Sequence, residues 1–541
     1  MSNAMGGSAS SEGAGFLALV RCACILLFGS TLLFAGPARA QSNQAVPIVT
    51  INAGQVAGVP RTGATVFWNI PFATAERWEA PRHVARWAGI RKESGPGAIC
   101  PQQVSDNTMP ISLQSEDCLS LNVWVPAGRH TKPLPVMFWI HGGSFRVGGG
   151  GIPLYDGEQI VARDVILVTI NYRLGLLGRF AHPDLSREQA GQPRANYGLM
   201  DQVAALEWVK RNIGAFGGDP GNVTIFGYSA GGVAVNYLMA APSAFGLFHK
   251  AISQSGGLQI DTTRDISKTR PGMLGKSLES EGLATAAHFG SKEAPLSLAK
   301  LRTLPAKDLI AYQEKTLIGS LNPVVDGVLI PDDIGRTFRD GKQARVPYMA
   351  GSTSWEDSLL HYVSPPLPPR AILAGIENLA AAREAFGNLD DAAMANAWFA
   401  DSVFLGTAHY LTNASARIGQ RSWLYFFDHV SPALRGTVPG AAHGNEVPFI
   451  FGTLPLKIRG LEAHTVSAED RKVSALMLGY WTNFAKRGDP NARRLPKLKM
   501  REEGDYSMNV LNARPRVASH FLEKRMRFLD RYYADRIDLS K

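Results

Sequence analysis

One serine of this chain stands in a pattern that can turn a hydroxyl into a nucleophile. Ser229 lies within G-Y-S-A-G at residues 227–231, which has the spacing G-x-S-x-G. In this motif the serine sits on a sharp, strained turn that exposes its hydroxyl. The two glycines leave room for a strand and a helix to approach each other there. The alternative is a surface turn that has this sequence by chance, so the flanking segments must decide.

The segments on both sides of Ser229 favour catalysis. Residues 223–226 are V-T-I-F, a β-branched and aromatic run that predicts a buried strand, and residues 233–239 are compatible with a helix. Strand, turn and helix in this order are the context that such a serine requires. The sequence therefore predicts Ser229 as the nucleophile.

Further segments predict the framework around this turn. Short β-rich runs over residues 46–73 suggest an antiparallel edge, and residues 258–322 are helical and weakly patterned, as expected of an insertion over the mouth of a site. A helix is predicted over residues 203–212. The remaining predicted strands cover residues 121–125, 135–140, 165–170, 251–256, 345–350 and 423–427.

Besides the serine motif, the chain contains five further segments that stand out, at residues 70–73 (I-P-F-A), 116–123 (E-D-C-L-S-L-N-V), 171–175 (N-Y-R-L-G), 442–452 (A-H-G-N-E-V-P-F-I-F-G) and 480–485 (Y-W-T-N-F-A). These motifs, in this order, resemble those of the type-B carboxylesterases, the α/β-hydrolase branch that includes cholinesterases and lipases. The resemblance covers nearly the whole mature chain. It implies an α/β fold with a central, mostly parallel sheet flanked by helices and with helical cap insertions.

The resemblance implies a catalytic triad of Ser229, Glu356 and His443, in the hydrolase order of nucleophile, acid and base. His443 lies in the segment that resembles H-G-x-E-x-x-F-x-F-G. Glu356 occupies the register of the family's acid, but it lies in W-E-D rather than in the usual D-E-G or D-E-A, which keeps Asp357 as a rival. A solvated acidic pair without a catalytic role is the third interpretation.

The resemblance also implies an oxyanion hole formed by the backbone amides of Gly143, Ser144 and Ala230. Such donors stabilise the alkoxide that develops during ester cleavage, by roughly 3 kcal/mol each. Ser144 replaces the usual third glycine, which puts the usual conformation of this loop in doubt. Ser255 matches a serine that the family places beside the acid, and His141 is expected to be structural.

Arg146 follows the oxyanion loop, and its guanidinium could pair with a substrate carboxylate at the mouth of the site. The alternative is a structural salt bridge with an acidic residue. Arg173 is expected to form such a structural pair. The chain carries 56 basic and 46 acidic residues, a net charge of +10, and this excess is spread rather than gathered in the stripe that nucleic-acid binding requires. It could still attract anionic substrates from a distance.

The N-terminal segment predicts export. Met1 to Ala4 resemble an expression-tag remnant, Arg21 precedes an apolar stretch over residues 22–35, and residues 38–40 (A-R-A) fit a signal-peptidase site before Gln41. The apolar stretch is shorter than the roughly 20 residues that span a bilayer, so a membrane anchor is not expected. Residues 1–40 are thus assigned to tag and signal peptide, and residues 41–541 to one carboxylesterase domain.

The cysteine content agrees with export. Cys22 and Cys24 lie in the predicted signal peptide, so residues 41–541 contain Cys100 and Cys118 alone, without the spacing of a metal site. The resemblance implies a disulfide between these two. Two unpaired buried thiols are the alternative.

The resemblance implies hydrolysis of small-molecule esters through an acyl-enzyme, with no metal, organic cofactor or nucleic acid. A lipase or an amidase would use the same triad, but the insertions carry many charges, which favours an esterase. Adhesion proteins of this superfamily lose triad members, whereas all three are present here. In length, leader and basic balance the chain is also similar to the bacterial esterases that remove tricarballylate from fumonisins, which implies an anionic polycarboxylate ester as substrate.

Overall fold

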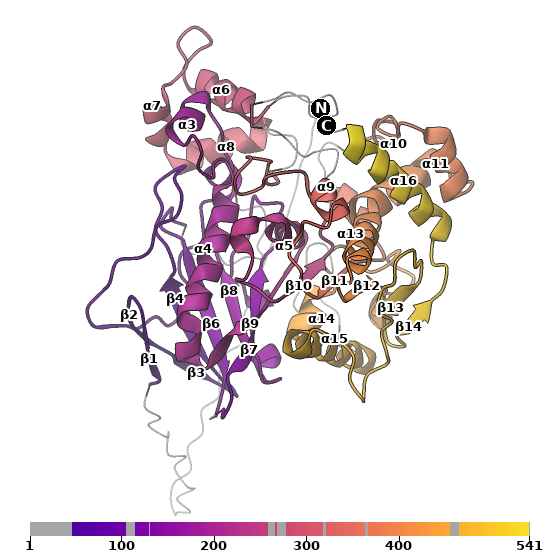
Figure 1. Cartoon of the computed structure of the whole chain (residues 1–541), viewed down its shortest axis with the longest axis horizontal. Coiled ribbons are helices and arrows are strands. Elements are labelled where there is room, and N and C mark those ends of the chain that lie inside the picture. The colour runs from indigo at the N-terminus through magenta and orange to yellow at the C-terminus, as the bar shows by residue number, and fades with distance from the viewer. Residues whose placement is uncertain are drawn as a thin grey trace, which may run out of the picture. The chain divides into compact units, whose positions relative to one another are not determined.

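The computed structural model of the chain describes residues 46–103, 114–128, 130–257, 266–267, 277–316, 321–362, 366–454 and 465–539. Eleven strands of these residues form one sheet in the order β14-β13-β12-β11-β10-β9-β7-β8-β6-β4-β3 (Figure 1). In this order, each pair of neighbouring strands from β13 through to β8 is parallel. The pairs at the two edges of the sheet are antiparallel. The strands are β3 (Val59–Arg61), β4 (Ala64–Pro71), β6 (Ser120–Pro126), β7 (Leu134–Ile140), β8 (Ile166–Ile170), β9 (Gly218–Tyr228), β10 (Lys250–Gln254), β11 (Tyr348–Thr353), β12 (Ser422–Phe427), β13 (Met508–Leu511) and β14 (Arg516–Ala518).

The central strands are buried on both faces, which explains their nearly continuous apolar sequences. In β7, Phe138 and Ile140 point into one hydrophobic core, while Met137 and Trp139 point into another. This alternation follows from the two-residue period of a strand. Each core is closed by helices that lie against its own face of the sheet.

The first core includes residues of α4 and α5, and the second those of α14 and α15. The longer helices are α4 (Tyr197–Asn212), α5 (Ala230–Ala240), α6 (Leu278–Phe289), α8 (Ala306–Thr316), α11 (Leu379–Phe386), α12 (Asp391–Ala400), α13 (Gly406–Arg417), α15 (Ala468–Arg487) and α16 (Glu523–Leu539). The shorter ones are α1 (Glu158–Val161), α2 (Gly175–Gly178), α3 (Pro183–Glu188), α7 (Leu298–Arg302), α9 (Ile334–Arg339), α10 (Pro369–Leu373), α14 (Val447–Phe451) and the π-helical turn η5 (Asp401–Leu405).

The predicted α/β fold is confirmed, and the predicted strands differ from the observed ones mainly at their ends. β9 begins at Gly218, five residues before the predicted start, and α4 begins at Tyr197 rather than at residue 203. β11 starts at Tyr348, later than predicted, directly after Pro347, which has no N–H to donate to a ladder. The expected N-terminal antiparallel edge consists of β3 and β4, and β1 (Ile48–Ile51), β2 (Gly54–Ala57) and β5 (Ile90–Arg91) form a separate small sheet.

The insertion after β10 is helical where the structure describes it. Helices α6, α7 and α8 account for most of residues 277–316. A serine hydroxyl caps the first two of these helices: Ser277 accepts from the N–H of Ser280, and Ser297 accepts from that of Lys300. Most of residues 258–276 lie outside the described residues, as do residues 317–320.

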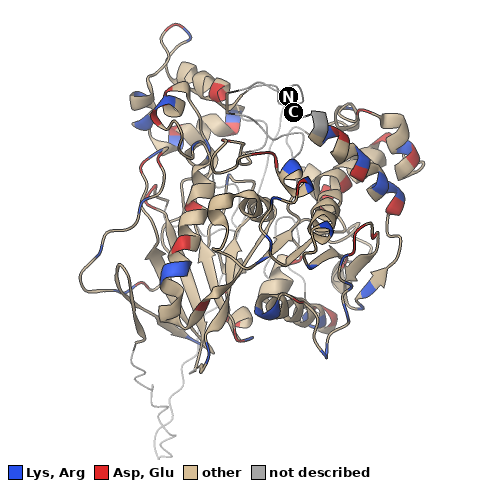
Figure 2. Ribbon diagram, viewed as in Figure 1, with Lys and Arg blue, Asp and Glu red and all other residues tan. Residues whose placement is uncertain are grey.

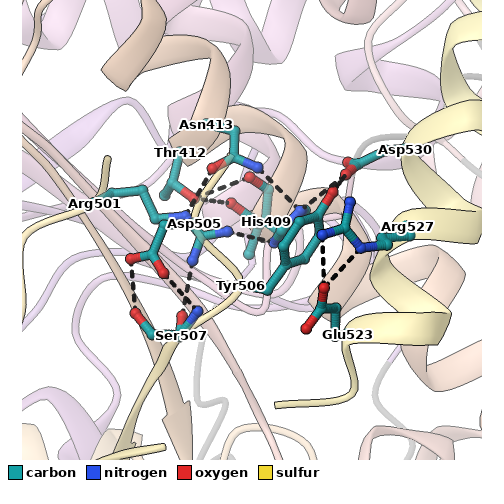
Figure 3. A network of polar contacts seen from close by, with 11 residues as sticks. His409, Thr412, Asn413, Arg501, Asp505, Tyr506, Ser507, Glu523, Arg527 and Asp530 are labelled. Atoms are coloured by element: carbon teal, nitrogen blue, oxygen red, sulfur yellow. Dashed lines mark hydrogen bonds and ion pairs between the residues drawn. The ribbon is translucent and has the colours of Figure 1, made fainter. Parts of the chain in front are cut away.

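A buried polar network ties the C-terminal helix to the rest of the fold (Figure 3). Nδ1 of His409 on α13 accepts a hydrogen bond from Arg501 Nη2 at 2.6 Å, and its Nε2 lies 3.2 Å from Asp530 Oδ2 on α16. Tyr506 donates its phenol hydrogen to the same carboxylate oxygen at 3.0 Å, and its ring stacks on the imidazole. The network therefore connects α13, the segment before β13, and α16.

Cys100 and Cys118 form a disulfide, as the resemblance implied. The bridge closes a loop with a sequence separation of 18 residues, for which the loss of chain entropy in the unfolded state predicts a stabilisation of about 3 kcal/mol. Cys118 directly precedes the hydrogen-bonded segment that leads into β6. The disulfide thus anchors the beginning of this strand.

Basic and acidic side chains are interspersed along the described ribbon (Figure 2). α16 shows the mixture, because its sequence E-K-R-M-R-F-L-D-R-Y-Y-A-D-R-I-D-L alternates the two signs. No helix in the described part of the chain is long and apolar enough to cross a membrane. Residues Val46–Lys541 form one compact unit, whereas the predicted signal peptide and its cleavage site lie outside the described residues.

Candidate active site

Ser229 lies on a sharp turn between β9 and α5. Its backbone has φ 54° and ψ −126°. Residues other than glycine rarely adopt this conformation, which costs roughly 1–3 kcal/mol. The Ser229 N–H donates to the carbonyl of Gln254 at 2.8 Å, which holds the turn against the end of β10. A Cβ at Gly227 would lie 2.6 Å from the Ile140 carbonyl oxygen, and one at Gly231 only 2.0 Å from it. Both positions therefore require glycine.

Glu356 and His443 meet at the ends of β11 and β12. Glu356 Oε2 lies 2.5 Å from Nδ1 of His443, and the carboxylate is buried. Its other oxygen, Oε1, accepts from the Ser255 hydroxyl at 2.6 Å and from the Thr353 N–H at 2.7 Å. These hydrogen bonds fix the orientation of the carboxylate. Ser255 thus lies beside the acid, where the family resemblance placed it.

The His443 loop is held against the Glu356 loop by its backbone. The Trp355 N–H donates to the Ala441 carbonyl at 2.9 Å, and the His443 N–H donates to the Ser358 hydroxyl at 3.0 Å. Nε2 of His443 is buried and has no hydrogen-bond partner among the residues that the structure describes. A histidine held at Nδ1 by a carboxylate, with Nε2 free to take a proton, has the form of a general base.

Asp357, the rival acid, lies elsewhere. The carboxylate oxygen that contacts the His443 ring is that of Glu356, whereas the histidine whose charge acts on Asp357 is His361. Burial raises the pKa of Asp357. The geometry therefore favours Glu356 as the residue that orients His443.

The segment after β7 turns sharply beside Ser229. Gly143, Ser144 and Phe145 all have positive φ, of 112°, 56° and 56°. The serine at position 144 thus adopts a left-handed conformation that a glycine would adopt more easily. Within the described part of the chain, the amides of Gly143, Ser144 and Ala230 donate no hydrogen bond to another residue. Free amides on such a turn are suited to bind an oxyanion.

His141 supports this loop from inside the protein. Its ring is buried and stacks on Tyr172 at 4.3 Å, and Nδ1 lies 2.8 Å from the Gly142 carbonyl oxygen, to which its hydrogen is donated. Burial lowers the pKa of His141 to about 4, so the ring is neutral at physiological pH. The Tyr172 hydroxyl donates to the His141 carbonyl at 2.8 Å. These contacts agree with the structural role expected of His141.

Two arginines near the site form ion pairs. Arg146 Nη1 lies 3.8 Å from Glu314 Oε2 on α8, which is the alternative to a substrate contact. Arg173 makes a buried bidentate pair with Asp201, at 2.9 and 2.7 Å, and also donates to the carbonyl of Glu79. Arg173 is therefore structural, as expected.

Three residues beside His443 were missed by the sequence reasoning. Tyr228 precedes Ser229 in the motif, and Phe404, on the π-helical turn η5, lies with its ring centroid 5.1 Å from that of His443. Glu446 is fully buried next to the pair, and burial, together with the charge of Glu356, raises its pKa to about 7. Tyr228 and Glu446 lie within motifs that the sequence already displayed, whereas no local pattern marked Phe404.

The described residues include no group of three or more His, Cys, Asp or Glu side chains that could hold a metal ion.

Comparisons with known proteins agree with this geometry. The chain matches the model of the carboxylesterase family over residues 45–373 and 390–529. It is 34% identical over 459 residues to para-nitrobenzyl esterase of Bacillus subtilis (strain 168), covering 82% of this chain and 90% of the relative. It is 31% identical over 488 residues to fumonisin B1 esterase of Sphingopyxis macrogoltabida, covering 86% of each. Among solved structures, a carboxylesterase of Geobacillus stearothermophilus aligns with a TM-score of 0.76 and 30% identity, over 89% of this chain and 99% of that one.

Proposed function

Because this chain belongs to the carboxylesterase family and is a serine-type carboxylic ester hydrolase, we propose that Ser229, Glu356 and His443 form its catalytic triad. The observation that carries the proposal is the buried contact of 2.5 Å between Glu356 and His443, in a site that also contains the strained turn of Ser229. A serine hydroxyl is a weak nucleophile until a base takes its proton. The triad supplies that base.

In the proposed reaction, His443 Nε2 accepts the proton of Ser229 while the hydroxyl oxygen attacks the ester carbonyl. The carbonyl oxygen becomes an alkoxide, which the amides of Gly143, Ser144 and Ala230 stabilise. His443 then donates its proton to the leaving alcohol, and an acyl-enzyme remains on Ser229. Water, deprotonated by the same imidazole, releases the acid. Glu356 keeps the hydrogen on Nδ1 and stabilises the imidazolium.

Three variants test these roles. Ser229→Ala should abolish both hydrolysis of a chromogenic short-chain ester and labelling by an organophosphate, with an unchanged circular dichroism spectrum. Glu356→Gln should lower kcat by about 10⁴-fold, while the matched Asp357→Asn should change it far less. Substantial turnover by Ser229→Ala, or a larger loss in Asp357→Asn, would contradict the triad.

For the substrate, we propose anionic polycarboxylate esters, such as the tricarballylate esters of fumonisins. In this proposal the enzyme is exported. The similarity to fumonisin B1 esterase over most of both chains supports this class, as does the basic balance of the chain. Arg146 is the proposed clamp for a substrate carboxylate, and Glu314 is the anion that a substrate carboxylate would replace. The signal peptide predicted within residues 1–40 supports export.

The clamp is tested with an ester that bears a free carboxylate and a neutral ester of similar size. Arg146→Ala should lower kcat/KM for the anionic ester by about tenfold and leave the neutral ester unchanged, since a charged hydrogen bond contributes about 1.5–3 kcal/mol. Glu314→Gln, which removes the competing anion, should raise kcat/KM for the anionic ester. Equal losses on both esters in Arg146→Ala would leave the Arg146–Glu314 pair as scaffold alone.

A further inference from the structure

The side chain of Tyr228 contacts both halves of the proposed catalytic machinery. Its ring centroid lies 6.2 Å from that of His443, with an interplanar angle of 41°. On another side the ring covers the backbone of Gly142, where an added Cβ would lie 2.7 Å from Tyr228 Cε1. Gly142 directly precedes Gly143, the first of the proposed oxyanion donors. One side chain therefore lies against the general base and against the loop that carries the oxyanion donors.

Tyr228 is itself held by a rigid aromatic cluster. Its ring stacks nearly parallel on Trp139, with an interplanar angle of 7° and a centroid distance of 6.0 Å. Trp139 is fully buried and also packs on Tyr155, Phe226 and Phe451, at 5.0, 4.8 and 4.8 Å. A ring that rests on such a core has little freedom to move. Its position is thus determined by the sheet rather than by the surface loops.

His443 needs support of this kind. The hydrogen bond at Nδ1 anchors one atom of the imidazole, yet Nε2 must point at the Ser229 hydroxyl for proton transfer. Phe404 lies against the imidazole at 5.1 Å with an interplanar angle of 53°, and Tyr228 is the second aromatic neighbour. Aromatic rings around an imidazole restrict its rotation by steric contact.

On the basis of the triad proposed above, we propose that Tyr228 is a positioning residue: its ring keeps the His443 imidazole and the oxyanion loop in register around Ser229. The ring is responsible for this, because it makes the contacts with His443, Trp139 and Gly142. The phenol group lies near that of Tyr155, which belongs to the same cluster and whose pKa Tyr228 helps to raise after burial. Misplacement of reacting groups by about 1 Å can reduce a rate by about 10²-fold, so the effect should be measurable in kcat.

The test compares Tyr228→Leu, which removes the ring, with Tyr228→Phe, which keeps it. Tyr228→Leu should lower kcat by about 10- to 100-fold with KM within about threefold of wild type, because substrate binding does not depend on the imidazole orientation. Tyr228→Phe should restore kcat to within about threefold. Thermal unfolding of each variant reports whether the fold is intact.

The matched control is Phe484→Leu, which removes a fully buried ring from the same hydrophobic core. Among the described residues this ring packs on Trp423 and has no ring contact with Tyr228, Trp139 or His443. Its kcat should stay within about threefold of wild type. A loss in Phe484→Leu equal to that in Tyr228→Leu, an equal loss in Tyr228→Phe, or an unchanged kcat in Tyr228→Leu would each overturn the positioning role. Ser229→Ala in the same assay separates the two proposals, because turnover there would remove the triad on which this role rests.

Discussion

Two glutamates lie beside His443, and their surroundings differ. Glu356 accepts hydrogen bonds from a hydroxyl, a backbone N–H and the imidazole. Glu446 is fully buried, and burial together with the charge of Glu356 raises its pKa to about 7. The Glu446 carboxyl group is therefore largely protonated below neutral pH.

Glu446 predicts a pH dependence of stability. A carboxyl group whose pKa rises from 4.5 to about 7 on folding binds its proton more tightly in the folded state. The free energy of unfolding must therefore fall as the pH rises from about 4.5 to about 7, by about 3 kcal/mol in total. Glu446→Gln should remove this loss, so its stability relative to wild type should be greater at pH 8 than at pH 5 in urea unfolding. The exposed Glu503→Gln serves as control, and equal differences at the two pH values would contradict the prediction.

Ser144 raises a separate question, because it adopts a positive φ within the oxyanion loop. If its contribution is the backbone amide, the side chain is dispensable. Ser144→Ala and Ser144→Gly should then keep kcat within about threefold of wild type, whereas loss of an oxyanion donor costs about 10²- to 10³-fold. Steady-state kinetics on a neutral ester is the measurement. A hundredfold loss in both variants would show that the hydroxyl takes part.

At the scale of elements, the site depends on contacts between segments far apart in the sequence. The π-helical turn η5 places Phe404 against His443. Two side chains of α16 bind to this turn. Arg525 pairs with Asp401 at 3.1 Å, and the Tyr533 hydroxyl donates to the Ser402 carbonyl at 2.6 Å. π-helical turns are rare and frequently occur at functional sites. The C-terminal helix thus supports the aromatic surroundings of His443, the proposed catalytic base.

The network around His409 predicts that this support weakens in acid. Burial lowers the pKa of His409, although the neighbouring Asp530 opposes part of this effect and Arg501 adds to it. Because the unfolded state then binds the proton more readily, the free energy of unfolding should decrease as the pH falls below about 6.5, by at most about 1.4 kcal/mol per pH unit. His409→Gln should flatten this acid dependence in unfolding experiments between pH 5 and pH 7.5. His130→Gln, at an exposed position, should not, and identical slopes in wild type and His409→Gln would refute the interpretation.

For the whole molecule, charge is the property that acts over the longest distance. The net charge of +10 becomes +9 when Arg21, Arg39 and Glu12 of the predicted leader are left out, and the two signs are interspersed over the described ribbon (Figure 2). Such a balance creates a weak positive field without a dedicated binding stripe. It favours the approach of anionic esters in general rather than the recognition of one.

This field predicts a dependence on salt. Raising the ionic strength from about 0.01 to about 1 M shortens the screening length from about 30 to about 3 Å, so kcat/KM for an anionic ester should decrease several-fold. A neutral ester of similar size should show no comparable change and serves as the control. Parallel behaviour of the two esters would indicate that the net charge has no part in substrate capture.

The local pattern of residues was sufficient to predict much of the fold and of the candidate site. Ser229 and its two flanking glycines identified the turn. A side chain at Gly227 or Gly231 would collide with the Ile140 carbonyl, so the turn requires glycine at these two positions, both close to Ser229 in sequence. The buried strands were visible as apolar runs, since a strand covered on both faces must be apolar at every position. The ends of these strands were not visible in the sequence, because the end of a strand depends on the partner with which it pairs.

Other properties depended on contacts between distant segments. Only the structure shows that the carboxylate of Glu356 reaches Nδ1 of His443, 87 residues away in sequence, which favours Glu356 over Asp357. The pairing of Arg146 with Glu314 and the place of Phe404 beside the imidazole likewise follow from the packing of separate helices. A residue pattern records what its neighbours in sequence require. Which distant side chains meet is determined by the packing of complete helices and strands, and that packing exists only in the tertiary structure.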